Sequence, residues 1–384
     1  MGNTVGHQRR RQRTVRLVRR VDRATGQPGD AASAPSAPAG DDSPRLFSLE
    51  RWLGARQRGV LLAIVIASIG IRIAALVQIT GSSLADLQQW DQTDMHYYDG
   101  WARAIAGGDW LSRSVGVPMH AWHIDVADAH LKAHPNDRAP LETEALRTGR
   151  TVETQLWTRW NGEHTFYEDP LYAYLVAATY KVVGAHPLAV LAWQLCLGVL
   201  TNVAIVLVAR RCFGSAVVGA LAGLMAVLAA PLVHYELLLL RDSTIVFATV
   251  GLVWLTTKCL DVDGWAWPAA LGAALGLSVL LKGTFLLVAL GTAVAFLLRS
   301  RGLRGSGLAG LAAFAIALSP AVIRNVTVGA PGFALAGGGA PTFIASNVPD
   351  YPASGGLHVD ATEVADVLGT SGDRLWPAVG ATLR

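Results

Sequence analysis

Long apolar runs constrain the fold of this chain more than any other feature. The sequence is 52% hydrophobic and only 16% charged, whereas an average soluble domain carries about 25% charged residues. The longer runs reach the ~20 residues that a helix needs to cross a hydrocarbon core, and a helix satisfies its backbone hydrogen bonds without water. The sequence therefore predicts an all-α polytopic membrane protein. The predicted crossings are residues 60–79, 187–209, 214–233, 236–257, 267–281, 284–298 and 307–323.

The distribution of charge predicts how these crossings are oriented. Residues 1–58 contain twelve Arg and five acidic residues, and the later basic clusters follow crossings that end on the same side. Cytoplasmic segments of membrane proteins are enriched in Arg and Lys, so we expect these ends to be cytoplasmic. The loop 80–169, with fourteen acidic and seven basic residues, then lies outside. This orientation requires that residues 171–184, a short apolar run with Lys181, form a re-entrant or surface helix.

The same pattern divides the chain into three parts. Residues 1–58 are expected to form a disordered basic tail that binds anionic lipid, a simpler interpretation than nucleic-acid binding. Residues 59–323 form the transmembrane module, with 80–169 as its large extracytoplasmic first loop. Residues 324–384 contain no further crossing, and we interpret them as a truncated outer segment. Only four of the 32 basic residues are Lys, a composition typical of GC-rich bacteria, so we expect a multi-pass protein of the inner (plasma) membrane, within the cell envelope.

The first candidate site lies soon after the first crossing, where the chain has just left the bilayer. Asp94, Tyr97, Tyr98 and Trp101 have the spacing that places residues on one face of a helix. A helix lying in the membrane interface has Tyr and Trp at headgroup level, which explains the aromatic residues but not the carboxylate. We therefore predict Asp94 as a general base acting on a hydroxyl at the water–lipid boundary, with Tyr97 and Tyr98 as substrate contacts.

A second acidic cluster closes the same loop. Glu168 and Asp169 are followed by Pro170, which favours the first position of a helix and places both carboxylates near the positive end of a helix dipole. Helix capping explains this arrangement as well as function does. If both clusters act together, one carboxylate accepts the proton of an attacking hydroxyl and the other orients substrate or a cation. We predict Asp94 and Glu168 as catalytic residues and Asp169 as a substrate contact.

Ionisable residues in or beside the predicted crossings form a third group. Charge in a bilayer is costly and usually has a structural or functional reason. The cations concentrate toward the face of the acidic loop, and Arg offers bidentate hydrogen bonds to a phosphate. The structural alternative is that Glu236, Arg241 and Asp242 satisfy one another while Arg72 and Lys282 extend to lipid headgroups. The predicted substrate-binding cations are Arg72, Arg241, Lys282 and Arg324.

The outer loop also contains histidines at spacings that permit metal binding. His120 and His123 are three residues apart, and His130 and His134 are four apart. Solvated loop histidines are the simpler interpretation, so we predict no metal site, although a divalent metal remains compatible with the sequence. The three cysteines lie in or beside apolar runs and show neither a disulfide nor a zinc pattern. No cofactor follows from these residues.

Several short motifs occur in a defined order along the chain. They are an Arg within the first crossing, D-x-x-x-Y at 94–98 followed by GDW at 108–110, YEDPL at 167–171, LLKGT at 280–284 and SPxxxRN at 319–325. In this order they resemble the GT-C glycosyltransferases, specifically the bacterial family-39 type related to protein O-mannosyltransferases and the aminoarabinose lipid A transferase. The resemblance implies a polyprenyl-phosphate-sugar donor and transfer on the extracytoplasmic face. It also implies Asp94 as base, Glu168 as the acidic residue of the second motif, and Lys282 and Arg324 as ligands of the donor phosphate.

Our leading hypothesis is an integral membrane glycosyltransferase. It moves a sugar from a polyprenyl-phosphate donor to a hydroxyl of a lipid, glycan or protein acceptor, with inversion and without nucleic acid. The alternative is a transporter or flippase of a lipid-linked substrate, with the charges lining a pathway. Transporters often contain internal repeats, and none is evident in this sequence. A geometric test is whether Asp94 and Glu168 converge on one site.

Overall fold

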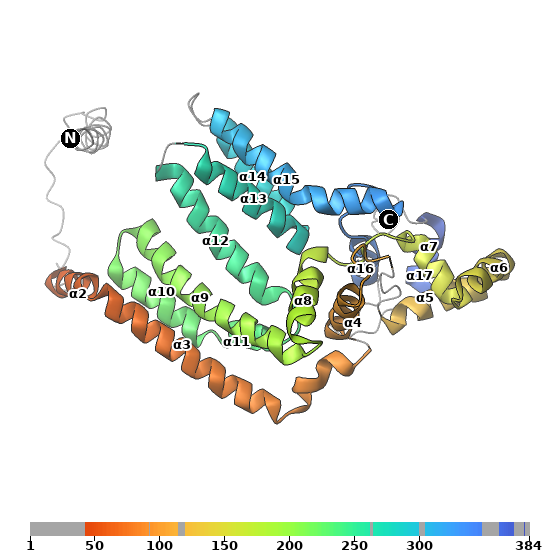
Figure 1. Cartoon of the computed structure of the whole chain (residues 1–384), viewed down its shortest axis with the longest axis horizontal. Coiled ribbons are helices and arrows are strands. Elements are labelled where there is room, and N and C mark those ends of the chain that lie inside the picture. The colour runs from red at the N-terminus through yellow and green to blue at the C-terminus, as the bar shows by residue number, and fades with distance from the viewer. Residues whose placement is uncertain are drawn as a thin grey trace, which may run out of the picture. The chain divides into compact units, whose positions relative to one another are not determined.

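The computed structural model describes residues 43–91, 93–113, 120–261, 264–298, 304–347, 361–371 and 380. Within these residues every regular element is a helix, which confirms the predicted all-α membrane class (Figure 1). Residues 1–42 of the predicted basic tail lie outside the described ranges. The chain divides into two compact units, Met1–Phe47 and Ser48–Arg384. The first contains the start of α2 (Ser43–Ala55), and the second contains all the elements that follow.

Four helices are long and apolar enough to cross a membrane, among the residues that the structure describes. A fifth span exists if the bent pair α10 (Ala216–Leu228) and α11 (Ala230–Glu236) is counted as one. The predicted crossings 267–281 and 284–298 correspond to shorter apolar helices. By length, the structure therefore supports fewer full spans than the seven expected. The four long helices are α3 (Gln57–Thr80), α9 (Pro187–Phe213), α12 (Asp242–Asp261) and α15 (Arg304–Val328), and the two shorter ones are α13 (Ala266–Leu281) and α14 (Phe285–Leu298).

The bend between α10 and α11 breaks the third predicted crossing, 214–233. The two helices are bent by 55° at this break. Pro231 lies in the first turn of α11. Because a proline lacks the N–H group, it is tolerated at a helix start but not inside a continuous helix, and the helix therefore breaks before it. The fourth predicted crossing, 236–257, also begins later than expected, since residues 237–241 are not helical and α12 starts at Asp242.

Small residues allow the closest helix contact in the bundle. α13 packs along α15, and a Cβ atom at Gly272 would collide with the backbone of Gly310. Lipid tails are as apolar as a leucine side chain, so helices in a bilayer associate through close packing rather than through exclusion of water. On the other side of the bundle, α9 contacts α3, α10 and α12.

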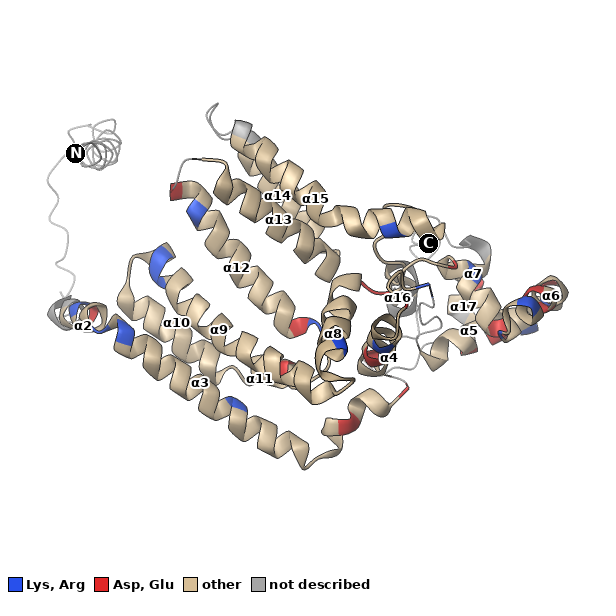
Figure 2. Ribbon diagram, viewed as in Figure 1, with Lys and Arg blue, Asp and Glu red and all other residues tan. Residues whose placement is uncertain are grey.

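One end of the bundle gathers basic helix ends (Figure 2). Arg211 at the end of α9 pairs with Asp261 at the end of α12. The Glu50 carboxylate of α2 accepts hydrogen bonds from the backbone N–H groups of Ala216 and Val217 at the start of α10. These contacts bring together the helix ends that the charge pattern assigns to one side of the membrane.

The predicted outer loop folds into short helices rather than an open chain. α4 packs along α8, which has 14 residues and is too short to cross a bilayer, in agreement with the expectation for 171–184. α5 and α7 pack together, and α17 (Ala361–Ser371) covers α5 with α16 (Gly339–Asn347) beside it. The loop elements are η1 (Ser83–Gln89), α4 (Asp94–Ala106), α5 (Ala121–Ala133), η2 (Pro135–Asp137), α6 (Arg138–Thr148), α7 (Val152–Asn161) and α8 (Pro170–Val183).

Aromatic side chains form the core between α4 and α8. Tyr98, Trp101, Phe166 and Tyr172 are each no more than 3% exposed. The Tyr98 and Tyr172 rings meet edge to face at 4.9 Å, and the Trp101 and Phe166 rings lie 5.5 Å apart. Full burial of one such side chain contributes on the order of 2 kcal/mol. This core fixes α4 against α8 and so determines where the first residues of both helices lie.

Candidate active site

An arginine and two carboxylates form the centre of the candidate site. Arg241 Nη1 lies 2.5 Å from Glu168 Oε2 and 3.0 Å from Asp169 Oδ2. The two acidic residues directly precede α8, which begins at Pro170 as the sequence predicts, and Arg241 directly precedes α12. The structural alternative drawn from the sequence is therefore wrong for Arg241, because its carboxylate partners lie on the α8 side and do not include Glu236.

Asp169 also ties this cluster to the turn after α13. Its Oδ1 atom accepts a hydrogen bond from the Gly283 backbone N–H at 3.1 Å. Burial raises the pKa of Asp169, while Arg241, the Gly283 N–H and the positive charge of Lys282 oppose that rise. The YEDPL and LLKGT motifs, more than a hundred residues apart, therefore meet at one carboxylate.

Glu168 lies in surroundings that favour its neutral form. Burial raises the pKa of Glu168 above its ordinary value, Arg241 lowers it, and the negative charges of Asp169 and Asp94 raise it further. A carboxyl group with a raised pKa exchanges its proton closer to neutral pH, which is a common property of catalytic acids and bases. The influence of Asp94 on Glu168 also means that the two predicted catalytic residues lie close enough to interact.

Asp94 lies at the open edge of the cluster. It is the first residue of α4, whose N-terminus is capped by Thr93 through a hydrogen bond from the His96 backbone N–H. The Asp94 side chain is 58% exposed, and its Oδ1 atom lies 3.1 Å from Nε2 of His120, the residue before α5. A carboxylate that is open to solvent and oriented by one imidazole can accept a proton from an incoming hydroxyl.

His120 and His123 connect Asp94 to the core beneath it. The His120 backbone N–H donates to His123 Nδ1 at 3.4 Å, and His123 Nε2 lies 3.2 Å from the Tyr167 hydroxyl. The His123 ring stacks on Trp157 at 4.0 Å. Burial lowers the pKa of His123 to about 2, and His120 adds to this effect, so the ring is neutral at physiological pH. Helix packing and support of Asp94 therefore explain the three-residue spacing of these histidines.

The second histidine pair has a similar structural explanation. His130 Nε2 lies 3.0 Å from Asp137 Oδ2, and the His130 and His134 rings stack at 4.4 Å. Within the described part of the chain, no group of three or more His, Cys, Asp or Glu side chains is arranged to hold a metal ion.

Tyr97 and Tyr98 lie beneath the cluster. Their side chains are only 5% and 2% exposed. The interpretation of α4 as a helix with its aromatic residues at headgroup level is therefore wrong, because this face packs against α8. Burial raises the pKa of both hydroxyls, and the negative charge of Glu168 adds to the rise. Both tyrosines are neutral donors close to the candidate site.

Arg72 is separate from this cluster. It is 2% exposed within α3 and forms a two-point ion pair with Glu236 of α11, with Nε–Oε2 and Nη2–Oε1 distances of 2.6 Å. Its Nη1 atom donates to Ser68 Oγ at 2.5 Å, and Asn202 Nδ2 donates to the same oxygen at 2.9 Å. The expectation that Arg72 extends to the headgroups is therefore wrong, since a buried carboxylate holds it inside the bundle.

Arg324 joins α15 to the outer loop. Its Nε, Nη1 and Nη2 atoms donate to the backbone carbonyls of Leu111, His164 and Ser112 at 2.6–2.7 Å. The guanidinium also lies over the Phe166 ring at 3.8 Å and is 5% exposed. Because these donors are directed at carbonyl oxygens, the contacts of Arg324 are structural, and the structure does not bring it to the Glu168 cluster.

We expect Arg324→Lys to loosen the outer loop. A lysine is a point charge that cannot bond to three carbonyls in one plane, and each lost hydrogen bond to a charged group costs about 1.5–3 kcal/mol. Hydrogen exchange of the amides around residues 111–112 and 164 should accelerate by at least ~10-fold. Arg159→Lys, at an exposed position of α7, is the matched control and should leave exchange unchanged. Equal exchange in the two variants would remove Arg324 as an anchor.

A glycine-rich stretch contributes to the site in a way that was not predicted. The Gly337 N–H donates to the Phe166 carbonyl at 2.6 Å, and the Gly338 N–H donates to the Tyr167 carbonyl at 2.8 Å. A Cβ atom at Gly338 would lie 2.8 Å from that carbonyl oxygen, so the position requires glycine. The run of three glycines was the available signal for such close backbone approach. The pairing fixes the backbone directly before Glu168.

Comparison with known proteins adds one finding. Residues 164–323 match the family model described as dolichyl-phosphate-mannose-protein mannosyltransferase. The matched segment includes Glu168, Asp169, Arg241 and Lys282, whereas Asp94 precedes it. No curated protein and no solved structure matches the chain significantly. The family match supports the GT-C resemblance and indicates a membrane glycosyltransferase of the mannosyltransferase type.

Proposed function

We propose that the protein is a bacterial GT-C enzyme of the family-39 type that transfers a sugar from a polyprenyl-phosphate donor to an acceptor hydroxyl. Transfer proceeds with inversion at the outer face of the plasma membrane. The observation that carries the proposal is the convergence of Glu168, Asp169, Arg241 and Lys282 beside Asp94. These residues come from distant segments, and four of the five lie within the family match.

Asp94 is the proposed general base. Its side chain is 58% exposed, against 22% for Glu168 and 9% for Asp169, so an acceptor hydroxyl can reach it most easily. The acceptor oxygen gives its proton to Asp94 while it forms a bond with the anomeric carbon of the donor. The bond between that carbon and the phosphate oxygen breaks on the opposite side, and its electron pair leaves with the polyprenyl phosphate.

Arg241 and Lys282 are the proposed ligands of the departing phosphate. The two ion pairs of Arg241 with carboxylates are made through Nη1, so Nε and Nη2 are the atoms that we propose to bind the phosphate. Positive charge placed where negative charge develops lowers the barrier to reaction. Glu168 and Asp169 orient the guanidinium. Arg72 and Arg324 are not part of this assignment because their donors are engaged inside the protein.

A labelled donor tests this proposal. The full chain is reconstituted in vesicles made from its native membrane lipids, and radiolabelled polyprenyl-phosphate mannose is added. We expect the label to move from the donor to an acceptor in these lipids. Lys282→Ala should slow the transfer at least ~10-fold, whereas Lys258→Ala, at the far end of α12, should leave it unchanged.

The bent pair α10–α11 is the observation that favours the transporter alternative, because broken helices are common in transporters. The same vesicle experiment tests it. Label that crosses the bilayer while it stays on its lipid would favour transport and contradict transfer. Label that neither moves nor leaves its lipid contradicts both functions.

The charge of Glu168 should set the acid side of the pH–rate profile. Burial raises the pKa of Glu168, so on acidification it loses its charge, and with it the attraction to Arg241, at a higher pH than an ordinary glutamate. We expect kcat to fall through that pH in the wild-type protein. Glu168→Gln should be slower at neutral pH and should lack this part of the pH dependence.

The stability of the fold should respond in the opposite direction. A carboxyl group whose pKa is raised in the folded state contributes stability that is present below its unfolded pKa and is lost as the pH rises through the folded pKa. Acidification should therefore reduce kcat before it lowers the thermal unfolding temperature. Parallel loss of activity and fold in the wild-type protein would argue against ionised Glu168 as the group responsible.

A further inference from the structure

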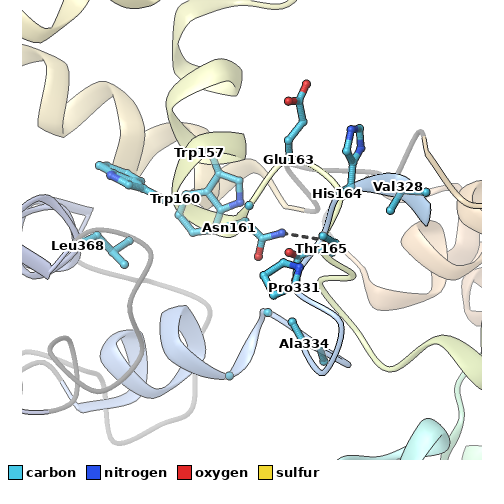
Figure 3. Close-up of a pocket in the computed structure, with 16 residues that line it drawn as sticks. Trp157, Trp160, Asn161, Glu163, His164, Thr165, Val328, Pro331, Ala334 and Leu368 are labelled. Carbon is cyan, nitrogen blue, oxygen red and sulfur yellow. Dashed lines mark hydrogen bonds between the residues drawn. The ribbon is translucent and has the colours of Figure 1, made fainter. Parts of the chain in front are cut away.

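A cavity of about 550 Å³ lies next to the candidate active site (Figure 3). Its walls come from the end of α7, the segment after α7, the last residue of α15 and the segment that follows it, Gly339 at the start of α16, and Leu368 of α17. Most of the wall therefore comes from the short helices and from the residues that follow α15. Its volume is in the ~300–1,000 Å³ range of small-molecule sites.

The lining of the cavity is aromatic and polar but not basic. It contains Trp157, Trp160, Asn161, Thr165 and backbone groups, and none of the lining residues that the structure describes is Lys or Arg. A phosphate group would find no lysine or arginine among these described residues. This contrasts with the Arg241 and Lys282 side of Glu168 and suits an uncharged ligand that is rich in hydroxyl groups.

The one carboxylate at the cavity does not change this conclusion. Glu163 pairs with Arg150 at 3.6 Å. Figure 3 shows the side chains of Glu163 and His164 directed away from Asn161, which lies between the tryptophan wall and Pro331. The interior is therefore formed by neutral groups, with the half-buried Trp160 offering an indole ring.

The position of the cavity relative to Glu168 is fixed by hydrogen bonds. Arg324 holds the His164 carbonyl at 2.6 Å, and Gly337 and Gly338 pair with the backbone of Phe166 and Tyr167. Glu168 lies three positions after Thr165, a span of at most ~11 Å in an extended chain. A molecule seated in the cavity can therefore place a neighbouring group at the acidic cluster.

We propose that this cavity binds a neutral sugar residue of the acceptor, a proposal that rests on the transfer function proposed above. The C–H groups of a pyranose ring carry partial positive charge and pack on the negative face of an indole, which Trp160 supplies. Amide, hydroxyl and backbone groups bond to its hydroxyls. Donor and acceptor are thereby separated by charge, with the phosphate on the Arg241 side and the acceptor glycan on the tryptophan side of residues 165–168.

Binding of mannobiose to the full chain in lipid nanodiscs tests this inference by saturation-transfer NMR. We expect saturation transfer to the sugar in the wild-type protein. Trp160→Ala should weaken binding at least ~10-fold, and Trp160→Phe, which keeps an aromatic face, should retain most of it. Ala336→Phe fills the cavity from an exposed position without removing a core side chain, and it should also abolish binding. Trp90→Ala, at an exposed tryptophan outside the cavity, is the control.

The outcomes separate this inference from the proposed function. Asp94→Asn should bind mannobiose as the wild-type protein does while it fails to transfer sugar. Binding in a wild-type protein that does not transfer sugar would overturn the proposed function. Sugar transfer by a wild-type protein that does not bind mannobiose would overturn the cavity inference. Binding of mannobiose by the Ala336→Phe variant as strongly as by the wild-type protein would also overturn it. Binding of a serine- and threonine-rich peptide in place of mannobiose would overturn it as well.

Discussion

Asp94→Asn should abolish sugar transfer by membranes that contain the full-length protein. Asparagine has nearly the shape of aspartate and can keep the contact with His120 that the carboxylate makes at 3.1 Å, but it cannot accept the proton of the acceptor hydroxyl. A positioned general base accelerates reactions by ~10²–10⁴-fold, so transfer of label from the donor should fall by about that factor. Binding of the donor, measured by its retention on the reconstituted protein, should change little.

The matched control for this prediction is Asp91→Asn. Asp91 lies three residues before Asp94 in the same loop and is exposed, so the substitution makes the same change of charge outside the cluster. It should leave transfer intact. The protein level of both variants is followed by immunoblot, because the exposed Asp94 side chain should not affect folding. Transfer by Asp94→Asn at the rate of Asp91→Asn would exclude Asp94 as the base and leave Glu168 as the candidate.

Local patterns predicted the helices that carry the candidate site. The spacing from Asp94 to Trp101 predicted a helix, which the structure contains as α4, and Pro170 predicted the start of α8. Both signals depend on residues within one or two turns of each other, so no knowledge of the fold is needed. The apolar runs predicted the long helices for a similar reason, because length and composition alone decide whether a helix can span a bilayer.

The partners of the charged residues could not be predicted in this way. Glu236 and Arg241 are close in sequence, yet residues 237–241 leave the helix, and the two side chains pair with different segments. Glu236 meets Arg72, which is 164 residues away, and a Cβ atom at Gly198 of α9 would collide with its carboxylate. Such a contact depends on how three helices pack, and no pattern within one segment records it.

His120 shows the same limit within the site. Its spacing from His123 permitted a metal, and solvated loop histidines were the simpler interpretation, whereas the structure places its ring against Asp94 and the His123 ring against Trp157. A motif identifies residues that are near one another on a helix, but their partners are supplied by the rest of the fold. Asp94 was found because it shares a helix face with aromatic residues, and Glu168 and Asp169 were found because Pro170 marks the start of the helix that follows them. The histidine that orients one of them was interpreted as a solvated loop residue, and its contact with Asp94 was not predicted.

Glu236→Gln should destabilise the helical bundle more than any surface substitution. The Arg72 and Glu236 side chains are only 3% and 5% exposed, so removal of the negative charge leaves a buried cation without its counter-ion. Breaking a buried ion pair from one side typically costs about 3–5 kcal/mol, whereas removing both partners is often close to neutral. The free energy of unfolding, measured in mixed micelles by titration with denaturing detergent, should fall by that amount. The double variant Arg72→Met, Glu236→Gln should regain most of the loss.

An exposed ion pair of equal length provides the control. The Lys132–Asp128 pair is also 2.6 Å long, but its side chains are 75% and 38% exposed, and exposed pairs contribute little because water solvates each charge when its partner is removed. The free energy of unfolding of Asp128→Asn should therefore equal that of the wild-type protein. If that of Glu236→Gln does so too, the Arg72–Glu236 pair does not hold α3 against α11. If Glu236→Gln loses stability, the double variant regains it and Asp128→Asn changes nothing, then the burial of the two charges determines the strength of this contact. The distance between the paired atoms does not, because it is the same in both ion pairs.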